Sequence, residues 1–174
     1  MKKRLLIISD LWGFEHSKWQ ECYISTLSPH FELQVYDSCK IGEIDLNDYQ
    51  EAKLHGQFVN GGIQKAVNRL LLEETKPLNI LAFSIGGTIA WQFALKSNLV
   101  QSLVCVSSSR LRKENQKPSS SIQLHYGADD PYIPPSSWFE ALKPNTRIWQ
   151  NEGHQVYQSQ SFCDAICQSL IKER

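Results

Sequence analysis

The sequence predicts an α/β fold: a three-layer α/β/α sandwich around a mostly or wholly parallel sheet of about six strands. Two observations lead to this fold class. Six short runs have the apolar or alternating pattern of β-strands, and segments with the period of amphipathic helices lie between them. Strands that alternate with helices form βαβ units, whose strands pair in parallel and whose helices cover both faces of the sheet.

Length and composition favour a single domain over residues 1–174. With 41% hydrophobic and 21% charged residues, the chain is ordinary for a globular protein and long enough to bury a core. The 18 basic residues balance the 18 acidic ones, which argues against nucleic acid or an anionic membrane as the main partner, because either calls for a basic face. The run Leu5–Ile8 is too short for a signal peptide, and no stretch reaches the roughly 18 apolar residues of a membrane span, so we expect a soluble, cytoplasmic protein.

The predicted strands share short length and β-type residues. Leu5–Ser9 is continuously apolar, as expected of a strand that is covered on both faces. Because functional residues of parallel sheets collect at the carboxyl ends of the strands, the residues after each run are the candidates for chemistry. The six runs are Leu5–Ser9, Glu32–Tyr36, Leu78–Phe83, Ser102–Ser107, Ile122–Tyr126 and Arg147–Gln150.

Helical periodicity is clearest in Gly61–Glu74, where apolar residues recur at i, i+4, i+7 and i+8 and Asn60 can cap the first turn. No element is predicted within residues 41–59, whose pattern fits neither period. The other predicted helices are Trp19–Leu27, Ile85–Lys96, Ser136–Leu142 and Tyr157–Lys172.

The segment Asn79–Trp91 (NILAFSIGGTIAW) carries the most specific signal in the chain. A β-type run ends there at Ser84, and a helix-like segment follows at once. A sharp strand-to-helix turn holds a serine hydroxyl out above the sheet, with helix N–H groups facing any oxyanion formed there. Small residues flank such a serine: Gly86 follows it, and Ala82 stands where the pattern G-x-S-x-G expects glycine. Ser84 is therefore a candidate nucleophile.

Two later strand ends offer partners for this serine. The run Ile122–Tyr126 leads into GADDPYIP, which contains Asp129 and Asp130, and the last run leads into NEGH, which ends in His154. A serine, a carboxylate and an imidazole therefore follow three different predicted strands.

These segments together resemble the α/β-hydrolase superfamily, which uses the chain order nucleophile, acid, base. SDLWGF, AFSIGG, YGADDPYIP and EGH span nearly the whole chain in the expected order. The family's acid loop commonly reads Gly, two residues, Asp, two residues, an apolar residue and Pro. Aligning it on Gly127 and the Ile-Pro pair selects Asp130 rather than Asp129. The family's base commonly follows a glycine, which matches Gly153 and His154.

The resemblance implies a serine hydrolase that cleaves a carboxylic ester or thioester of a small acyl group through an acyl-enzyme on Ser84. The hydroxyl needs a base, and His154, with an unperturbed pKa near 6.5, suits that task. Asp130 would hold the imidazole tautomer and stabilise the imidazolium. No metal and no organic cofactor are expected. The same three residues also suit an acyltransferase or peptidase, and a third alternative is a non-catalytic protein-binding module on a hydrolase scaffold.

The oxyanion of such a reaction needs backbone donors. Ile85 N–H is the first candidate, because it directly follows the nucleophile. The second is expected from the loop after the first strand, where Trp12 N–H is preferred and Leu11 N–H is the alternative; both residues are also expected to border the substrate. Many family members have His-Gly where this chain has Asp10-Leu11, which leaves the choice open.

Family members often carry a cap domain after the strand that corresponds to Ser102–Ser107. Only about fifteen residues separate that run from the next one, too few for a lid. We therefore expect a minimal fold with an open, solvent-reachable site, suited to a short acyl group or to an acyl group on a carrier that docks outside. Arg110 and Arg112 are candidate contacts for an anionic carrier or acid.

Five cysteines make an odd count without CxxC spacing. The sequence favours buried free thiols in a reducing compartment over a metal site.

Overall fold

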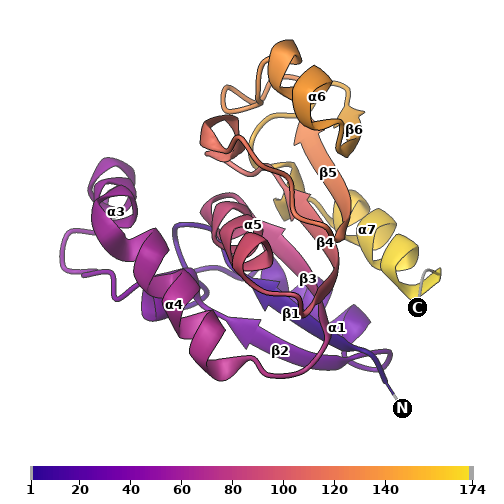
Figure 1. The fold of residues 1–174 in the computed structure, drawn as a ribbon, viewed down its shortest axis with the longest axis horizontal. Coiled ribbons are helices and arrows are strands. Elements are labelled where there is room, and N and C mark those ends of the chain that lie inside the picture. The colour runs from indigo at the N-terminus through magenta and orange to yellow at the C-terminus, as the bar shows by residue number, and fades with distance from the viewer. Residues whose placement is uncertain (1, 173–174) are drawn as a thin grey trace.

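The computed structural model describes residues 2–172 and contains one six-stranded sheet (Figure 1). The strand order is β2-β1-β3-β4-β5-β6, and every neighbouring pair is parallel. This confirms the predicted fold class. The strands are β1 (Arg4–Ile8), β2 (Glu32–Tyr36), β3 (Leu78–Phe83), β4 (Val100–Val106), β5 (Ser121–Gly127) and β6 (Asn145–Trp149).

Helices cover both faces of this sheet. Helices α1 and α7 pack on one face, and α4 and α5 pack on the other, with α5 crossing in front of the central strands in Figure 1. Among residues 2–172, no helix combines the length and the apolar character needed to cross a membrane. The helices are α1 (Gln20–Leu27), α2 (Ser38–Ile41), α3 (Glu51–Gln57), α4 (Ile63–Glu73), α5 (Ile85–Lys96), α6 (Ser136–Leu142) and α7 (Gln160–Lys172).

The continuous apolar run of β1 is explained by its place between the two helix layers. Leu5 and Ile7 point into the cluster that includes α1 and α7, whereas Leu6 and Ile8 point into the cluster that includes α4 and α5. Successive side chains of a strand alternate between faces, so a strand covered on both sides must be apolar at every position.

The direction in which the chain adds strands to the sheet reverses at β1, and this switch point locates the candidate site. The chain passes from β1 outward to β2, then returns past β1 to β3 and continues to β6. Ligands bind outside the carboxyl ends of strands at such a switch point. Ile8 of β1 pairs with Ala82 of β3, so the loop after β1 and the turn at Ser84 meet at the same edge.

The start of α4 differs from the prediction. Asn60 does not cap this helix, which begins at Ile63 after Gly62. Asn60 lies instead in a π-helical segment, Phe58–Gly62, where Gly61 has a φ of 127° and the backbone kinks. A positive φ is accessible to glycine without steric cost, and α4 begins two residues later than predicted, at Ile63.

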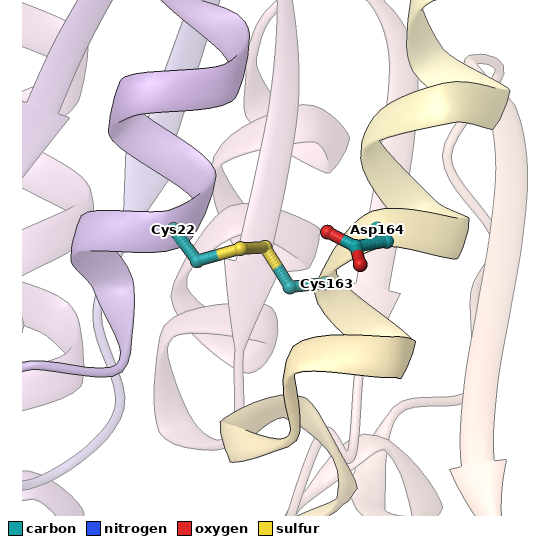
Figure 2. Close-up of side chains that lie close together, drawn as sticks. All are labelled: Cys22, Cys163 and Asp164. Atoms are coloured by element: carbon teal, nitrogen blue, oxygen red, sulfur yellow. A yellow bond between two sulfur atoms is a disulfide. The ribbon is translucent and has the colours of Figure 1, made fainter.

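Two cysteines form a disulfide, which corrects the expectation of free thiols. Cys22 on α1 and Cys163 on α7 are bonded, 141 residues apart in sequence (Figure 2). Asp164 lies beside the bridge, whose sulfurs are bonded to each other and are not thiolates. The prediction fails because only the packing of α1 against α7 brings the two residues together. For the other three cysteines the expectation of buried free thiols is confirmed: Cys39, Cys105 and Cys167.

The buried imidazole of His125 makes stability depend on pH. His125 is 2% exposed, and its Nδ1 accepts a hydrogen bond from the indole N–H of Trp149 (3.1 Å). Burial, with a smaller effect of the Arg147 charge, lowers the pKa of His125 to about 4. The unfolded chain takes up this proton below about pH 6.5 and the folded chain only near pH 4. This contribution to stability is therefore complete above pH 6.5 and is lost as the pH falls toward 4.

We expect the free energy of unfolding to fall by about 3 kcal/mol between pH 7 and pH 4 through His125 alone. Urea unfolding at several pH values measures the effect. The control is His125→Gln, which keeps an acceptor for Trp149 but does not titrate in this range. Equal pH dependence of the two proteins would contradict the assignment.

Candidate active site

Ser84 occupies a strained turn between β3 and α5. Its φ is 50° and its ψ is −119°, an unusual conformation for a residue with a side chain. Its N–H donates to the carbonyl of Val106 (2.9 Å), which anchors the turn to the end of β4. A Cβ at Gly86 would lie 2.2 Å from the carbonyl oxygen of Ser9. Glycine is therefore required there, as the sequence pattern predicts, because the turn presses α5 against the end of β1.

Three predicted side chains form a continuous hydrogen-bond chain at this edge. Ser84 Oγ lies 3.0 Å from His154 Nε2, and His154 Nδ1 lies 3.1 and 3.0 Å from the two carboxylate oxygens of Asp130. A carboxylate can only accept, so Nδ1 carries the proton and donates to Asp130. Nε2 is then the acceptor for the Ser84 hydroxyl. The three residues follow β3, β6 and β5, as predicted.

The structure separates Asp130 from its neighbour Asp129. The Asp130 side chain is fully buried and also accepts the N–H of Tyr132 (2.8 Å). Asp129 is exposed, and its backbone N–H donates to the backbone carbonyl oxygen of Glu152 (2.9 Å). A Cβ at Gly127 would lie 2.2 Å from the same carbonyl oxygen. The loop after β5 therefore packs backbone to backbone against the loop that carries the imidazole, which explains why the acid loop begins with glycine.

Solvent reaches this arrangement from the imidazole side. The His154 side chain is 19% exposed, whereas Ser84 is only 1% exposed. The Tyr132 ring meets the imidazole edge-on with 5.0 Å between centroids, and the Arg112 guanidinium lies over Tyr132. As expected, no lid follows β4, since that connection holds only the 3-10 turn Leu111–Lys113. The expectation of an open site holds for the imidazole and not for the serine, which the surrounding chain covers.

The loop after β1 differs from the prediction in one hydrogen bond. Asp10 is 0% exposed, its Oδ1 accepts the Trp12 N–H (3.0 Å), and its carbonyl accepts the Gly13 N–H (3.3 Å). The N–H chosen from the sequence as the second oxyanion donor is therefore already bonded to a carboxylate. Which of the Trp12 and Leu11 N–H groups faces an oxyanion stays a prediction.

Tyr49, in a stretch for which the sequence predicts no element, contacts the loop after β1. The Tyr49 hydroxyl donates to the carbonyl of Trp12 (2.6 Å), and the two rings pack with 5.2 Å between centroids. Tyr49 lies just before α3, within the stretch where the sequence predicts no element. This hydrogen bond and ring contact hold Trp12 in place within the loop after β1.

Sequence reasoning missed Tyr157. This residue was expected to open the C-terminal helix, but it lies in a separate 3-10 turn, Val156–Gln158, just after His154. Its buried hydroxyl donates to Asp10 Oδ2 (3.0 Å). Burial raises the pKa of Asp10 to about 6, although the bonds from Tyr157 and Trp12 act in the opposite direction. The two partners have a sequence separation of 147, and so distant a pairing leaves no signal in sequence spacing.

The comparisons with known proteins agree with this architecture. No protein-family model matches the sequence, and no curated protein matches it. Several solved structures do. A candidate hydrolase of the alpha/beta superfamily from Xanthomonas campestris pv. campestris is similar over 98% of this chain and 99% of its own, with a TM-score of 0.70 and 14% identity.

Two further structures extend this likeness. Alpha/beta hydrolase domain-containing protein 10 from mouse covers 97% of this chain and 88% of its own, with a TM-score of 0.68 and 11% identity. Est1E from Butyrivibrio proteoclasticus, solved with ferulic acid bound, covers 98% and 87%, with a TM-score of 0.66 and 10% identity. With its parallel six-stranded sheet and these structural neighbours, the chain has the fold of the α/β-hydrolase superfamily.

Proposed function

We propose that the protein is a serine hydrolase that cleaves a carboxylic ester or thioester of a small acyl group. The observation that carries the proposal is the hydrogen-bond chain from Ser84 Oγ through the His154 ring to the buried carboxylate of Asp130. A serine hydroxyl is protonated at neutral pH and becomes a nucleophile only when a base is in contact with it. The strained turn that presents Ser84 supports the same role.

The proposed reaction begins with acylation. Ser84 Oγ attacks the acyl carbon while His154 Nε2 takes the hydroxyl proton, and Asp130 stabilises the resulting imidazolium. The tetrahedral oxyanion accepts hydrogen bonds from Ile85 N–H and, in our assignment, from Leu11 N–H. The first N–H groups of a helix have no carbonyl partner within it, which makes Ile85 at the start of α5 a suitable donor.

Acylation is complete when the bond from the acyl carbon to the leaving group breaks and His154 returns its proton to the departing alcohol or thiol. Deacylation then repeats the cycle with water as the nucleophile. A water molecule attacks the acyl-enzyme, and the imidazole again acts as base and then protonates Ser84 as the carboxylic acid leaves. One set of three residues thus serves both halves of the reaction.

The surroundings of the site support a small acyl group. Ser84 is nearly covered, and no lid after β4 adds an extended acyl tunnel. A bulky leaving group, including a carrier, can remain outside on the exposed side of His154. The ferulic acid bound in the Est1E structure is a carboxylic acid, the product class of an ester hydrolase.

A fluorophosphonate probe tests the proposal directly. The wild-type protein should gain the mass of the phosphonyl adduct on the peptide that contains Ser84, and the Ser84→Ala variant should not. A wild-type protein that stays unlabelled would instead support the protein-binding alternative. A panel of p-nitrophenyl esters, acyl thioesters and peptides then distinguishes hydrolysis of esters from that of thioesters or amides.

A further inference from the structure

The buried carboxylate of Asp10 joins two parts of the candidate site that are far apart in sequence. Oδ1 accepts the N–H of Trp12, in the loop proposed to supply an oxyanion donor. Oδ2 accepts the hydroxyl of Tyr157, three residues after the proposed base His154. The Tyr157 carbonyl in turn accepts the buried hydroxyl of Tyr23, which fixes this turn to α1 (2.8 Å).

The carboxylate of Asp10 is not explained by a contribution to folding stability. Asp10 is completely buried, and among residues 2–172 no Lys or Arg side chain forms a salt bridge with it. Desolvation disfavours its charged form, and the charge of Asp37 acts in the same direction. The titratable groups that influence Asp10 or are influenced by it are Tyr157, His154, Asp37, Cys39 and Tyr49.

The ionised carboxylate therefore costs the folded state stability at neutral pH. The pKa of Asp10 is raised to about 6 in the fold, so the folded chain holds a proton that the unfolded chain has already released between about pH 4 and pH 6. The cost is absent below that interval and complete above it. A buried carboxylate that has no basic partner and instead binds two segments of the candidate site points to a role in positioning them.

We propose that Asp10 is a positioning residue that fixes the oxyanion loop relative to the segment that carries His154. This inference rests on the proposed function and deepens it. By accepting the Trp12 N–H, Asp10 turns that group back into the loop and leaves Leu11 N–H to face the oxyanion together with Ile85 N–H. By accepting the hydrogen bond from the Tyr157 hydroxyl, it fixes the position of the 3-10 turn Val156–Gln158, which follows the proposed base His154.

The same carboxylate acts electrostatically on the imidazole. Asp10 and His154 attract each other when both are charged, so an ionised Asp10 favours the imidazolium that forms as Ser84 is deprotonated. A protonated Asp10 loses this effect. The acid limb of the activity profile of the wild-type protein should therefore contain a protonation that depends on Asp10.

Three variants test the role with p-nitrophenyl acetate as substrate. Asp10→Ala removes both bonds, and kcat should fall about 10²-fold, the effect of losing an oxyanion donor, with KM within about threefold of wild type. Asp10→Asn keeps an acceptor for Trp12 and should retain kcat within about tenfold, and the protonation that depends on Asp10 should be absent from the acid limb of its activity profile. Tyr157→Phe removes a single bond and should lose less than Asp10→Ala.

Thermal unfolding separates positioning from a purely structural role. Asp10→Asn removes the buried charge, so its Tm at pH 7.5 should rise by a few degrees, and the rise should vanish at pH 4. Stability and kcat then change in opposite directions, whereas a residue kept for the fold would lower both when replaced. Variants with lower Tm and proportionately lower kcat would overturn the proposal.

Ser84→Ala, measured alongside, distinguishes this inference from the function on which it rests. Turnover that is the same in wild type and Ser84→Ala contradicts the proposed hydrolase, and with it the role of Asp10. Turnover that depends on Ser84 but is unchanged in Asp10→Ala, Asp10→Asn and Tyr157→Phe contradicts the positioning role alone.

Discussion

Replacing Ser84 with alanine should lower the turnover of p-nitrophenyl acetate by a factor on the order of 10⁶. The size of the loss follows from the geometry. Ser84, His154 and Asp130 lie in one hydrogen-bond chain, so removing the nucleophile leaves the other two without a proton to transfer. His154→Ala should cost a similar factor, and the Ser84→Ala/His154→Ala double variant should be no slower than either single one, because groups that act as a unit are not additive.

Ser107 provides a matched control. It follows β4 next to Ser84, is completely buried, and has the same φ of 50°. No imidazole contacts its hydroxyl among the described residues. Ser107→Ala therefore tests whether replacing any buried serine at this edge of the sheet lowers turnover. Its turnover should stay within a few-fold of wild type. Equal losses in Ser84→Ala and Ser107→Ala would mean that the reaction is not that of a Ser84 nucleophile.

Reducing the Cys22–Cys163 bridge should cost about 2–5 kcal/mol of stability, because the bridge closes a loop with a sequence separation of 141 and so restricts the unfolded chain strongly. For a chain of this size the Tm should fall by roughly 5–15 °C. Thermal unfolding with and without a phosphine reductant measures the change. The Cys22→Ser/Cys163→Ser double variant should melt at the temperature of the reduced wild type and should not respond to reductant.

Thiol counting provides the independent check on this bridge. Three thiols should react in denatured, unreduced protein, namely those of Cys39, Cys105 and Cys167, and all five should react after reduction. Five reactive thiols before reduction, together with a Tm that reductant does not change, would show that the bridge is not formed in the isolated protein. Cys39→Ser, a control outside the bridge, should leave the response to reductant intact.

The parts of the fold that local chemistry dictates could be predicted from the sequence. Strand β1 is apolar at each successive position from Leu5 to Ile8, the pattern expected of a strand buried on both faces. Gly86 and Gly127 mark two places where another backbone approaches too closely for any side chain, so they also mark the turns after β3 and β5. Helices α2 and α3 were not predicted: α2 has only four residues, and α3 lies in the stretch 41–59, whose apolar residues fit neither the helical nor the strand period.

Within the candidate site, residue identity was predictable but the use of each hydrogen-bonding group was not. Asp130 and His154 could be chosen because each belongs to a short motif, with its own glycine, that resembles the α/β-hydrolase superfamily. The bond from Trp12 N–H to Asp10 depends on the conformation of one loop. That conformation is fixed from outside by Tyr157 and Tyr49, and neither residue has a pattern that points to Asp10 or Trp12.

The sequence by itself determined the six strands with their alternation with longer helices, the parallel sheet, and the three residues whose chemistry fits a nucleophile, a base and an acid. These features depend on periodicity and on turns of a few residues, where the steric limits of the backbone are local. Only the tertiary structure decided that α1 is bonded to α7, that Ser84 is covered, and that a buried carboxylate holds the Trp12 N–H. Those outcomes depend on the packing of segments far apart along the chain, and such contacts leave no periodic trace in either segment.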